Sequence, residues 1–314
     1  MILYSSKFNG LSKLNHTFRG NFAFTLIELL VVIAIIGILS ALIIVGMNST
    51  TQKATIAKAQ VFSNSLRNSL MNDLISEWKF DGNANDSWSG GNNGTWYGAG
   101  GGTNLVANYR PTAECVSGQC LSFDGTDDYV NCGLGTNLSI TGALTISAWI
   151  KTSSLATQRV VSKLHNTGGW NGYSLYITSG GVTLQVFNGG SGNSTGVSYS
   201  FPLNTFFNVT YIYDGTNKKL YINGVYIGQA AAGVTSIGIT DTAFYIGRLL
   251  YYDPPTEHFS GSMDDIRIFD AAMPTSQIQQ NYFAGINKLL AKKQITQSDY
   301  QQRLVELSNN YAKK

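Results

Sequence analysis

Residues 207–224, FNVTYIYDGTNKKLYING, carry the clearest secondary-structure signal in this chain. Residues 207–213 and 219–222 are rich in β-branched and aromatic side chains, which favour strands. Residues 214–217, DGTN, have turn composition, and an Asn-Gly pair stands at 223–224. Because both residues of an Asn-Gly pair accept positive φ, the pair is typical of a β-hairpin turn. The stretch therefore predicts successive antiparallel strands.

The same pattern of short β-rich runs between Gly, Asn and Asp turns extends over residues 77–273. Further examples are residues 144–150, 173–177 and 182–187. A region of about 190 residues with so many strands fits one two-sheet sandwich or jelly roll better than two small domains. We therefore expect a mainly β fold here.

An apolar run, residues 24–47, precedes the β region and contains only three clearly polar side chains, Thr25, Glu28 and Ser40. A helix rises about 1.5 Å per residue, so a run of this length crosses the roughly 30 Å hydrocarbon core of a membrane. A lone carboxylate in lipid is costly unless it is paired or neutralised. Glu28 is therefore a candidate functional residue.

The flanks of this run predict its orientation and its length. Residues 1–23 contain Lys7, Lys13 and Arg19 but no acidic residue, which is typical of a cytoplasmic flank. Beyond the run, apolar residues recur at spacings of three and four: Ile56, Ala59, Phe62, Leu66, Leu70 and Leu74. We expect one long helix over residues 24–76, whose second half is a stalk.

The block Phe24-Thr25-Leu26-Ile27-Glu28 behind a basic leader resembles the N-terminus of type IV pilins and pseudopilins. The resemblance implies that a prepilin peptidase cuts between Ala23 and Phe24, and that Phe24 is then N-methylated. Family members usually carry Gly where this chain has Ala23, which is also small. An assembly role for Glu28 follows, because the new amine of a neighbouring subunit can pair with its carboxylate. An uncut signal anchor is the alternative.

Composition supports export and argues against direct binding of nucleic acid. Charged residues make up 12% of the chain, while Gly, Asn, Ser, Thr and Tyr are abundant. Removing the three leader cations from 21 basic residues leaves 18, which equals the number of acidic residues. Phosphate binding needs a basic excess on one face, and the mature chain has no such excess.

Five pieces of the β region resemble the laminin-G-like, concanavalin A-like lectin fold, and they occur in that family's order. They are residues 78–82 (WKFDG), 122–130 (SFDGTDDYV), 145–150 (TISAWI), 213–216 with 219–224 (YDGT, LYING preceded by Lys219), and 261–269 (GSMDDIRIF). The resemblance implies a jelly-roll β-sandwich. Because this fold hosts lectins, adhesins, hydrolases and spacers, function must be argued from sites.

A structural calcium ion is one expectation that the resemblance carries, since such an ion often ties the first strand to the last in lectin-like sandwiches. It would bring Asp81 near Asp264, and Ca²⁺ prefers several hard oxygen ligands. The alternative is that these aspartates form turns through bonds to backbone.

Exposed aromatic rings are the candidates for glycan binding, because rings stack on sugar faces. Five lie in loop-like contexts flanked by Gly or Pro: Trp88, Trp96, Trp170, Tyr251 and Tyr252. A retaining hydrolase of this fold would need two carboxylates about 5 Å apart. The head has only Glu77, Glu114 and Glu257, far apart in sequence, so we expect no catalysis.

Cysteines and the C-terminal tail complete the organisation. Cys115 and Cys120 are spaced for a short disulfide in an oxidising compartment, which leaves Cys132 over. In residues 274–314, apolar residues at helical spacing predict two helices that dock on the head or stalk: Ile278, Tyr282, Ile286 and Leu289, then Tyr300, Leu304, Leu307 and Tyr311.

These patterns predict an exported head on a single-pass anchor in the inner membrane, which reaches the cell surface or a pilus after assembly. Its partners would be other pilin subunits, the prepilin peptidase, the membrane, and a glycan or surface protein bound by a lectin-like head. A pseudopilin of a type II secretion or DNA-uptake machine is the alternative, and a glycoside hydrolase is a third.

Overall fold

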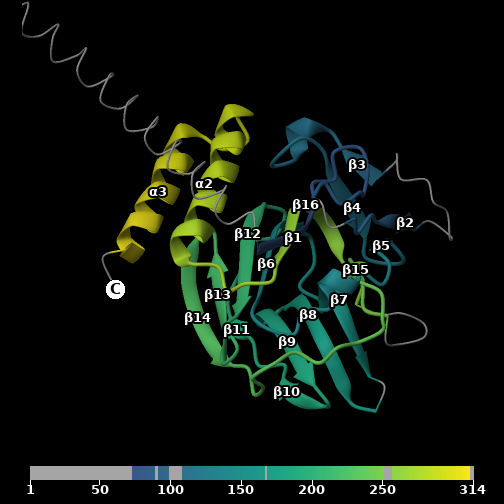
Figure 1. The fold of residues 1–314 in the computed structure, drawn as a ribbon. Coiled ribbons are helices and arrows are strands. Elements are labelled where there is room, and N and C mark those ends of the chain that lie inside the picture. The colour runs from purple at the N-terminus through teal and green to yellow at the C-terminus, as the bar shows by residue number, and fades with distance from the viewer. Residues whose placement is uncertain (1–72, 89–90, 99–107, 167, 251–256, 312–314) are drawn as a thin grey trace, which may run out of the picture. The chain divides into compact units, whose positions relative to one another are not determined.

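The computed structural model describes residues 73–88, 91–98, 108–166, 168–250 and 257–311 (Figure 1). The predicted leader, the apolar run and nearly all of the predicted stalk lie outside these residues, with Ala23, Phe24 and Glu28. The predicted ligand-binding residues Tyr251 and Tyr252 also lie outside them. In the described part of the chain, no helix has the length and apolar character needed to cross a membrane.

Two antiparallel sheets form the described fold (Figure 1). Sheet A has the strand order β14-β13-β12-β6-β16-β4-β3 with β1 paired to β16, and sheet B has the order β10-β9-β8-β7-β15-β5-β2 with β11 paired to β9. The strands of sheet A are β1 Leu74–Trp78, β3 Tyr109–Arg110, β4 Cys120–Asp124, β6 Leu144–Thr152, β12 Phe207–Tyr213, β13 Asn217–Ile222, β14 Val225–Ala231 and β16 Ser260–Phe269. Those of sheet B are β2 Thr95–Tyr97, β5 Tyr129–Asn131, β7 Gln158–Asn166, β8 Trp170–Thr178, β9 Gly181–Asn188, β10 Ser191–Asn193, β11 Val197–Ser198 and β15 Tyr245–Ile246.

Residues 207–224 have the structure that their sequence predicts. Strand β12 pairs antiparallel with β13, which in turn pairs with β14. Asn223 has φ 52° and Gly224 has φ 74° in the turn between β13 and β14. Positive φ at both positions is what a two-residue hairpin turn requires. The predictions of a mainly β region and of this hairpin are therefore confirmed.

The core lies between the two sheets because side chains alternate across each strand. One buried row crosses the inner face of sheet B from β2 to β9: Trp96, Val130, Ile246, Val161, Leu175 and Leu184. It faces a corresponding set from sheet A that includes Ile146, Ala148 and Ile150 of β6. The neighbouring positions in each strand therefore point away from the core.

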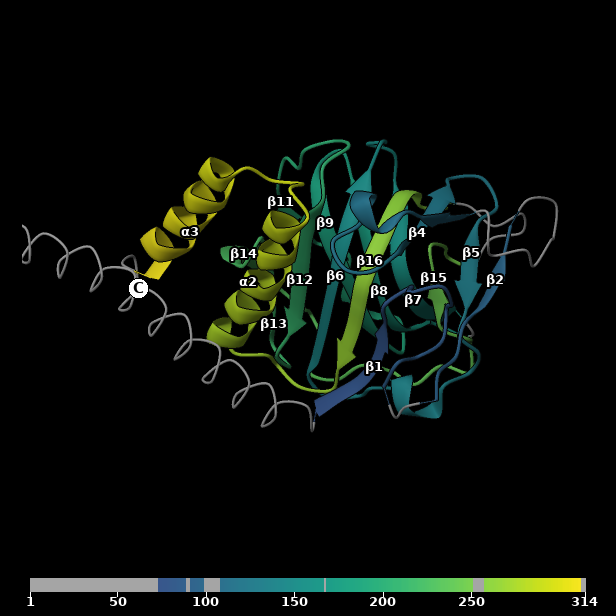
Figure 2. The ribbon, with the colours of Figure 1, turned by 90° about the horizontal axis from the view of Figure 1, so that it is seen from above.

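Two C-terminal helices, α2 Thr275–Ala291 and α3 Gln297–Tyr311, confirm the helical prediction for the tail. Helix α2 packs on sheet A, where the Tyr282 and Trp149 rings stack with centroids 5.5 Å apart (Figure 2). A Cβ at Gly285 would lie 2.2 Å from the Trp149 ring, so only glycine allows this approach. Part of the outer face of sheet A is therefore covered by the tail.

The stalk helix predicted to reach Ser76 is wrong over its last residues. Leu74–Trp78 is strand β1, and Ser76, Glu77 and Trp78 pair with Ile268, Arg267 and Ile266 of β16. The helical spacing ended at Leu74, but ladder bonds to the last strand and burial of Trp78 favour the extended conformation. Tertiary pairing overrides the local pattern here.

Candidate functional site

The outer face of sheet B carries a continuous row of polar and aromatic side chains. One position from the buried row, the strands carry in register Thr95, Asn131, Tyr245, Ser162, Ser174 and Gln185, of which Tyr245, Ser162 and Ser174 are themselves buried. Tyr97 pairs with Tyr129 two positions further along β2 and β5. Because α2 packs on sheet A, the row on sheet B is the stronger candidate for a ligand face.

Three tyrosines of this face form an aromatic group around Arg248. The Tyr97 and Tyr129 rings stack with centroids 4.9 Å apart, and Tyr245 meets Tyr129 edge-on at 6.0 Å. The Arg248 guanidinium lies 4.0 Å from the centroid of Tyr129 and 4.9 Å from that of Tyr245. Cation–π contacts of this kind fix the position of the charge.

Arg248 is buried without an acceptor for its Nε proton. The residue is 7% exposed, and its Nε has no hydrogen-bond partner in the described part of the chain. Leaving a buried charged donor unsatisfied costs free energy, which an added acceptor would recover. Burial, and then Arg248, lower the pKa of His258, so this neighbour is neutral at physiological pH. Arg248 is therefore the positive charge of the site.

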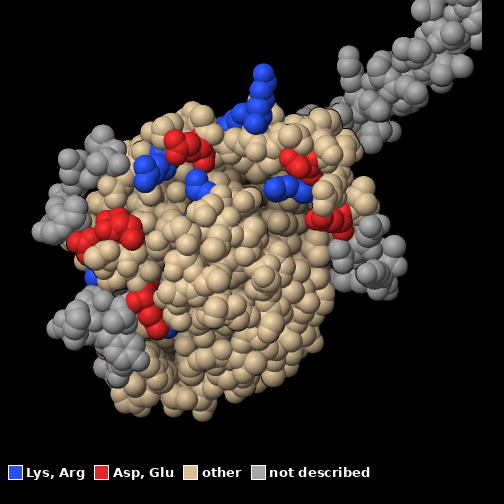
Figure 3. Space-filling model, turned by 180° about the vertical axis from the view of Figure 1, so that it is seen from behind, with Lys and Arg blue, Asp and Glu red and all other residues tan. Residues whose placement is uncertain are grey.

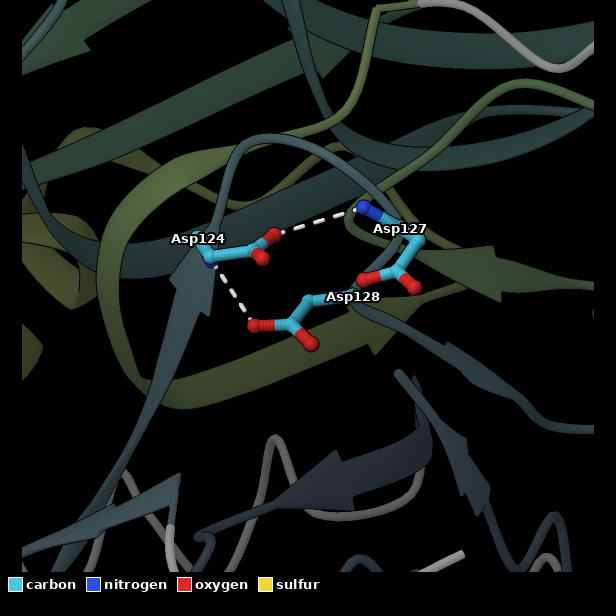
Figure 4. A group of neighbouring side chains, drawn as sticks. All are labelled: Asp124, Asp127 and Asp128. Carbon is cyan, nitrogen blue, oxygen red and sulfur yellow. Dashed lines mark hydrogen bonds between the residues drawn. The ribbon is translucent and has the colours of Figure 1, made fainter. Parts of the chain in front are cut away.

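The end of β4 and the turn that leads into Tyr129 of β5 carry three carboxylates, Asp124, Asp127 and Asp128 (Figure 4). One oxygen each from Asp124, Asp127 and Asp128 lies within 4.8 Å of the others. Asp128 Oδ2 accepts bonds from the Asp124 N–H at 2.8 Å and from Asn108 Nδ2 at 3.1 Å. Burial raises the pKa of Asp128 to about 6, and the charges of Asp124 and Asp127 add to that rise. The group can accept hydrogen bonds from hydroxyls, and its oxygens are of the type that hold a divalent cation.

A second arginine organises the other end of the row. Arg159 Nη1 donates to Ser174 Oγ at 3.1 Å, and its guanidinium lies 4.4 Å from the Tyr176 centroid. Its Nε pairs with Glu257. In contrast to Arg248, this arginine finds its acceptors, Ser174 and Glu257, within the protein. We therefore assign Arg159 a structural role on the sheet and not a role in ligand binding.

The predicted calcium ligands Asp81 and Asp264 both bond to the loop closed by the Cys115–Cys120 disulfide, which is confirmed. Asp264 Oδ2 accepts the Ser117 N–H at 2.9 Å, and Asp81 Oδ1 accepts the Gln119 N–H at 2.7 Å. The remaining oxygen of Asp264 and one oxygen of Asp265 are buried and have no hydrogen-bond partner within the described ranges. Burial, and then Asp265, raise the pKa of Asp264 well above its ordinary value. The orphaned oxygens fit a hard cation.

The C-terminal end of helix α2 already brings positive charge to the loop closed by the Cys115–Cys120 disulfide. Lys292 Nζ donates to the carbonyls of Thr112, Cys115 and Gly118 at 2.9, 3.1 and 3.4 Å. Lys288 Nζ donates to Ser117 Oγ at 2.7 Å and lies 3.5 Å from Asp265 Oδ2. The loop is thus held between carboxylates that accept its amides and lysines that donate to its carbonyls. These lysines compete electrostatically with a divalent ion.

The aromatic candidates named from sequence do not form one site. Trp96 is 4% exposed and packs against Phe123, so its prediction as an exposed ring is wrong, because its strand position points into the core. Trp88 packs on a cluster that contains Leu74 and Phe269, and Trp170 packs on another that contains Leu164 and Leu249. The tyrosines Tyr97, Tyr129 and Tyr245 and the cation Arg248 were not foreseen. The sequence holds one signal for Tyr97 and Tyr129. Side chains alternate along a strand, and these two tyrosines are next to the buried residues Trp96 and Val130, so they point to the opposite face.

The three head glutamates are distributed over separate parts of the fold. Glu77 pairs with Arg267 and Lys79, Glu257 pairs with Arg159, and Glu114 is exposed in the short 3-10 helix Thr112–Glu114. On the face seen in Figure 3, acidic and basic side chains lie in small groups, and no continuous basic patch is visible. That face therefore lacks the feature typical of a nucleic-acid surface.

Two segments of the chain match known protein families. Residues 18–44 match the prokaryotic N-terminal methylation motif, and residues 124–279 match the concanavalin A-like lectin/glucanases superfamily. No curated protein matches the chain. The two matched segments are those on which the pilin and lectin resemblances rested.

Solved structures share the fold at low sequence identity. Domain 4 of AbnA, a GH43 extracellular arabinanase from Geobacillus stearothermophilus, in complex with arabinotriose, is similar with a TM-score of 0.50 and 19% identity, over 66% of this chain and 97% of that one. The binding domain of Paraclostridial Mosquitocidal Protein 1 gives a TM-score of 0.54 and 13% identity, and the match covers 69% of this chain and 53% of that domain. The botulinum neurotoxin serotype G binding domain gives a TM-score of 0.52 and 14% identity, and the match covers 67% of this chain and 51% of that domain. The match thus spans about half of each toxin domain.

Proposed function

We propose that this chain, which joins a prokaryotic N-terminal methylation motif to a domain of the concanavalin A-like lectin/glucanases superfamily, is a non-catalytic pilin-like subunit that displays a glycan-binding head. The N-terminal segment would anchor it in the inner membrane and, after cleavage before Phe24, assemble with other pilin subunits. The head would be exported and presented at the cell surface or on a filament.

The observation that supports glycan binding is Arg248, a buried cation whose Nε has no acceptor among the residues that the structure describes. Tyr97, Tyr129 and Tyr245 provide aromatic surface around it, and the Asp124–Asp128 turn provides hydroxyl acceptors. Donors, acceptors and rings together are what a sugar needs for orientation and affinity. Three carboxylates in the segment that leads into Tyr129, and one guanidinium over the Tyr129 ring, favour a neutral sugar over an acidic one. The domain of similar fold in complex with arabinotriose is consistent with this ligand class.

Substituting Arg248 with Met is expected to weaken glycan binding by roughly tenfold to a hundredfold, because methionine removes the donors but keeps an unbranched apolar side chain. Tyr129→Ala should give a loss of similar size. The measurement is retention of the full-length protein on an array of neutral oligosaccharides, followed by titration of each glycan that retains it.

Lys219→Met is the matched control, since it removes a cation on sheet A that is paired with Asp214. It should leave retention unchanged. If no glycan retains the wild-type protein, or if Arg248→Met binds as tightly as wild type, the assigned ligand is wrong. Loss of secretion or DNA uptake in a deletion strain would then favour the pseudopilin of such a machine.

Calcium between Asp81 and Asp264 stays a prediction, supported by the orphaned oxygens of Asp264 and Asp265. We expect Ca²⁺ to raise the unfolding temperature of EDTA-treated protein by a few degrees, since an ion that binds only the folded state stabilises it. Asp264→Asn should abolish the increase, while Asp127→Asn, at the other carboxylate group, should keep it. An unfolding temperature that responds to neither EDTA nor Ca²⁺ would show that Lys288 and Lys292 supply all the positive charge needed there.

A further inference from the structure

A pocket of about 320 Å³ lies where the C-terminal helices meet the sandwich, away from the glycan-binding residues proposed on sheet B. Its apolar lining comes from Phe206, Leu289 and Ile295, of which the first two are buried. Charged side chains line it as well: Lys151 of β6, Arg303 of α3 and Glu114. Its volume is at the lower end of the range for small-molecule sites, roughly 300–1,000 Å³.

The residues that line the pocket carry more positive than negative charge, and neither cation forms an ion pair with a described carboxylate. Lys151 Nζ lies 5.1 Å from the Phe206 ring centroid, and it makes no ion pair within the residues described. Arg303 Nη1 donates to the Tyr282 hydroxyl at 3.3 Å, which is an uncharged partner. Two acids of α3 lie within one turn of Arg303, and no ion pair joins either of them to it in the described part of the chain: Glu306 Oε1 accepts from Gln302 Nε2 at 3.1 Å, and Asp299 Oδ2 accepts the Thr296 N–H and hydroxyl.

Glu114 does not balance these two cations. It is exposed, and no ion pair links it to a described residue. Two cations and one carboxylate beside an apolar surface complement a ligand with the opposite arrangement, an apolar body and an anionic head. A charged acceptor between an ammonium and a guanidinium also gains from the low dielectric near buried Phe206 and Leu289.

We infer that this pocket binds a small amphipathic carboxylate, with its apolar body on Phe206, Leu289 and Ile295 and its carboxylate between Lys151 and Arg303. Such a ligand would contact the sandwich through Lys151 and Phe206 and the tail through Leu289 and Arg303. Its binding would therefore also strengthen the docking of the two C-terminal helices.

Hippurate is a suitable probe because it combines a phenyl ring with a carboxylate, and hippuramide is its neutral isostere. Titrated calorimetrically into the full-length protein in lipid nanodiscs, with empty nanodiscs subtracted, hippurate is expected to bind with a Kd on the order of 1 mM. Hippuramide should bind at least about tenfold more weakly, since it lacks the charge.

Two substitutions test the cations separately. Lys151→Met and Arg303→Gln should each weaken hippurate binding roughly fivefold to tenfold. Lys293→Gln, which removes an exposed tail lysine that does not line the pocket, should have no effect. Absence of saturable binding up to roughly 10 mM, equal affinity for hippurate and hippuramide, or full affinity in both pocket variants would overturn the assignment.

Discussion

Replacing Glu28 with valine is expected to abolish incorporation of the protein into a filament while leaving it in the membrane. Valine is apolar, so insertion of residues 24–47 should be retained. What is lost is the carboxylate that would pair with the freed amine of Phe24 in a neighbouring subunit, and breaking such a buried pair is costly. The measurement is the ratio of protein in sheared surface material to protein in membranes, which should fall at least about tenfold.

Ser40→Val is the matched control for this experiment, since it removes a polar group from the same apolar run without removing a charge. Intact mass of each protein should show a mature chain that begins at methylated Phe24. A wild-type chain that retains Met1 would contradict the pilin pathway. Equal surface fractions for Glu28→Val and Ser40→Val would show that the carboxylate has no part in assembly.

Replacing Arg267 with methionine is expected to lower the free energy of unfolding by roughly 3 kcal/mol. Arg267 Nε donates to Glu77 Oε1 at 2.7 Å, and its Nη2 lies 3.5 Å from Asp265 Oδ2. Both carboxylates are buried, at 5% and 3% exposure, so they would remain with less compensation. Lys79 still contacts Glu77, and Lys288 still contacts Asp265, which keeps the loss at the lower end of the range for a broken buried pair.

The pH dependence of this loss follows from Glu77. Burial alone would raise its pKa, but Arg267 and then Lys79 outweigh burial and hold it below its ordinary value of 4.5. A lowered pKa contributes stability above 4.5 that disappears as the pH falls through the folded-state value. In Arg267→Met the pKa of Glu77 should rise above 4.5 instead, so the difference in stability between the two proteins should begin to narrow above pH 4.5 and continue to narrow as the pH falls through the lowered wild-type pKa.

Denaturant unfolding at neutral and acidic pH measures this difference. Arg110→Met is the matched control, because Arg110 is exposed and its Nη2 donates only to the Ser122 hydroxyl. It should stay within about 0.5 kcal/mol of wild type. If the two arginine variants were equally stable, the Glu77–Arg267 pair between the first and last strands would contribute nothing to the fold.

Local sequence signals were sufficient to predict those elements of the head that form between residues close together in the chain. Positive φ at Asn223 and Gly224 serves a hairpin turn, and Cys115 and Cys120 are close enough in sequence to form a disulfide. The tail helices likewise follow from apolar spacing that faces one surface. Local signals did not predict strand β1, because its conformation depends on pairing with β16, which is far away in sequence.

The candidate site shows the same division more sharply. The five aromatic residues named from sequence were chosen for their loop-like context, which does not reveal whether a ring points inward or outward. Trp96 points into the core and Tyr97, its neighbour, points out, and that choice is made by the register of β2 on β5. Arg248 became a candidate only when its burial and its missing acceptor could be seen.

By itself, then, the sequence determined the N-terminal methylation motif, the mainly β class and the helical tail, because each is written in contiguous residues whose chemistry acts over a few positions. Tertiary structure alone decided that Tyr97, Tyr129, Tyr245 and Arg248 share one face, and that a pocket forms between the tail and the sandwich. The physical reason is that sheet register and helix docking bring together residues that have no local interaction in the chain, and the free energy of that packing depends on the whole core.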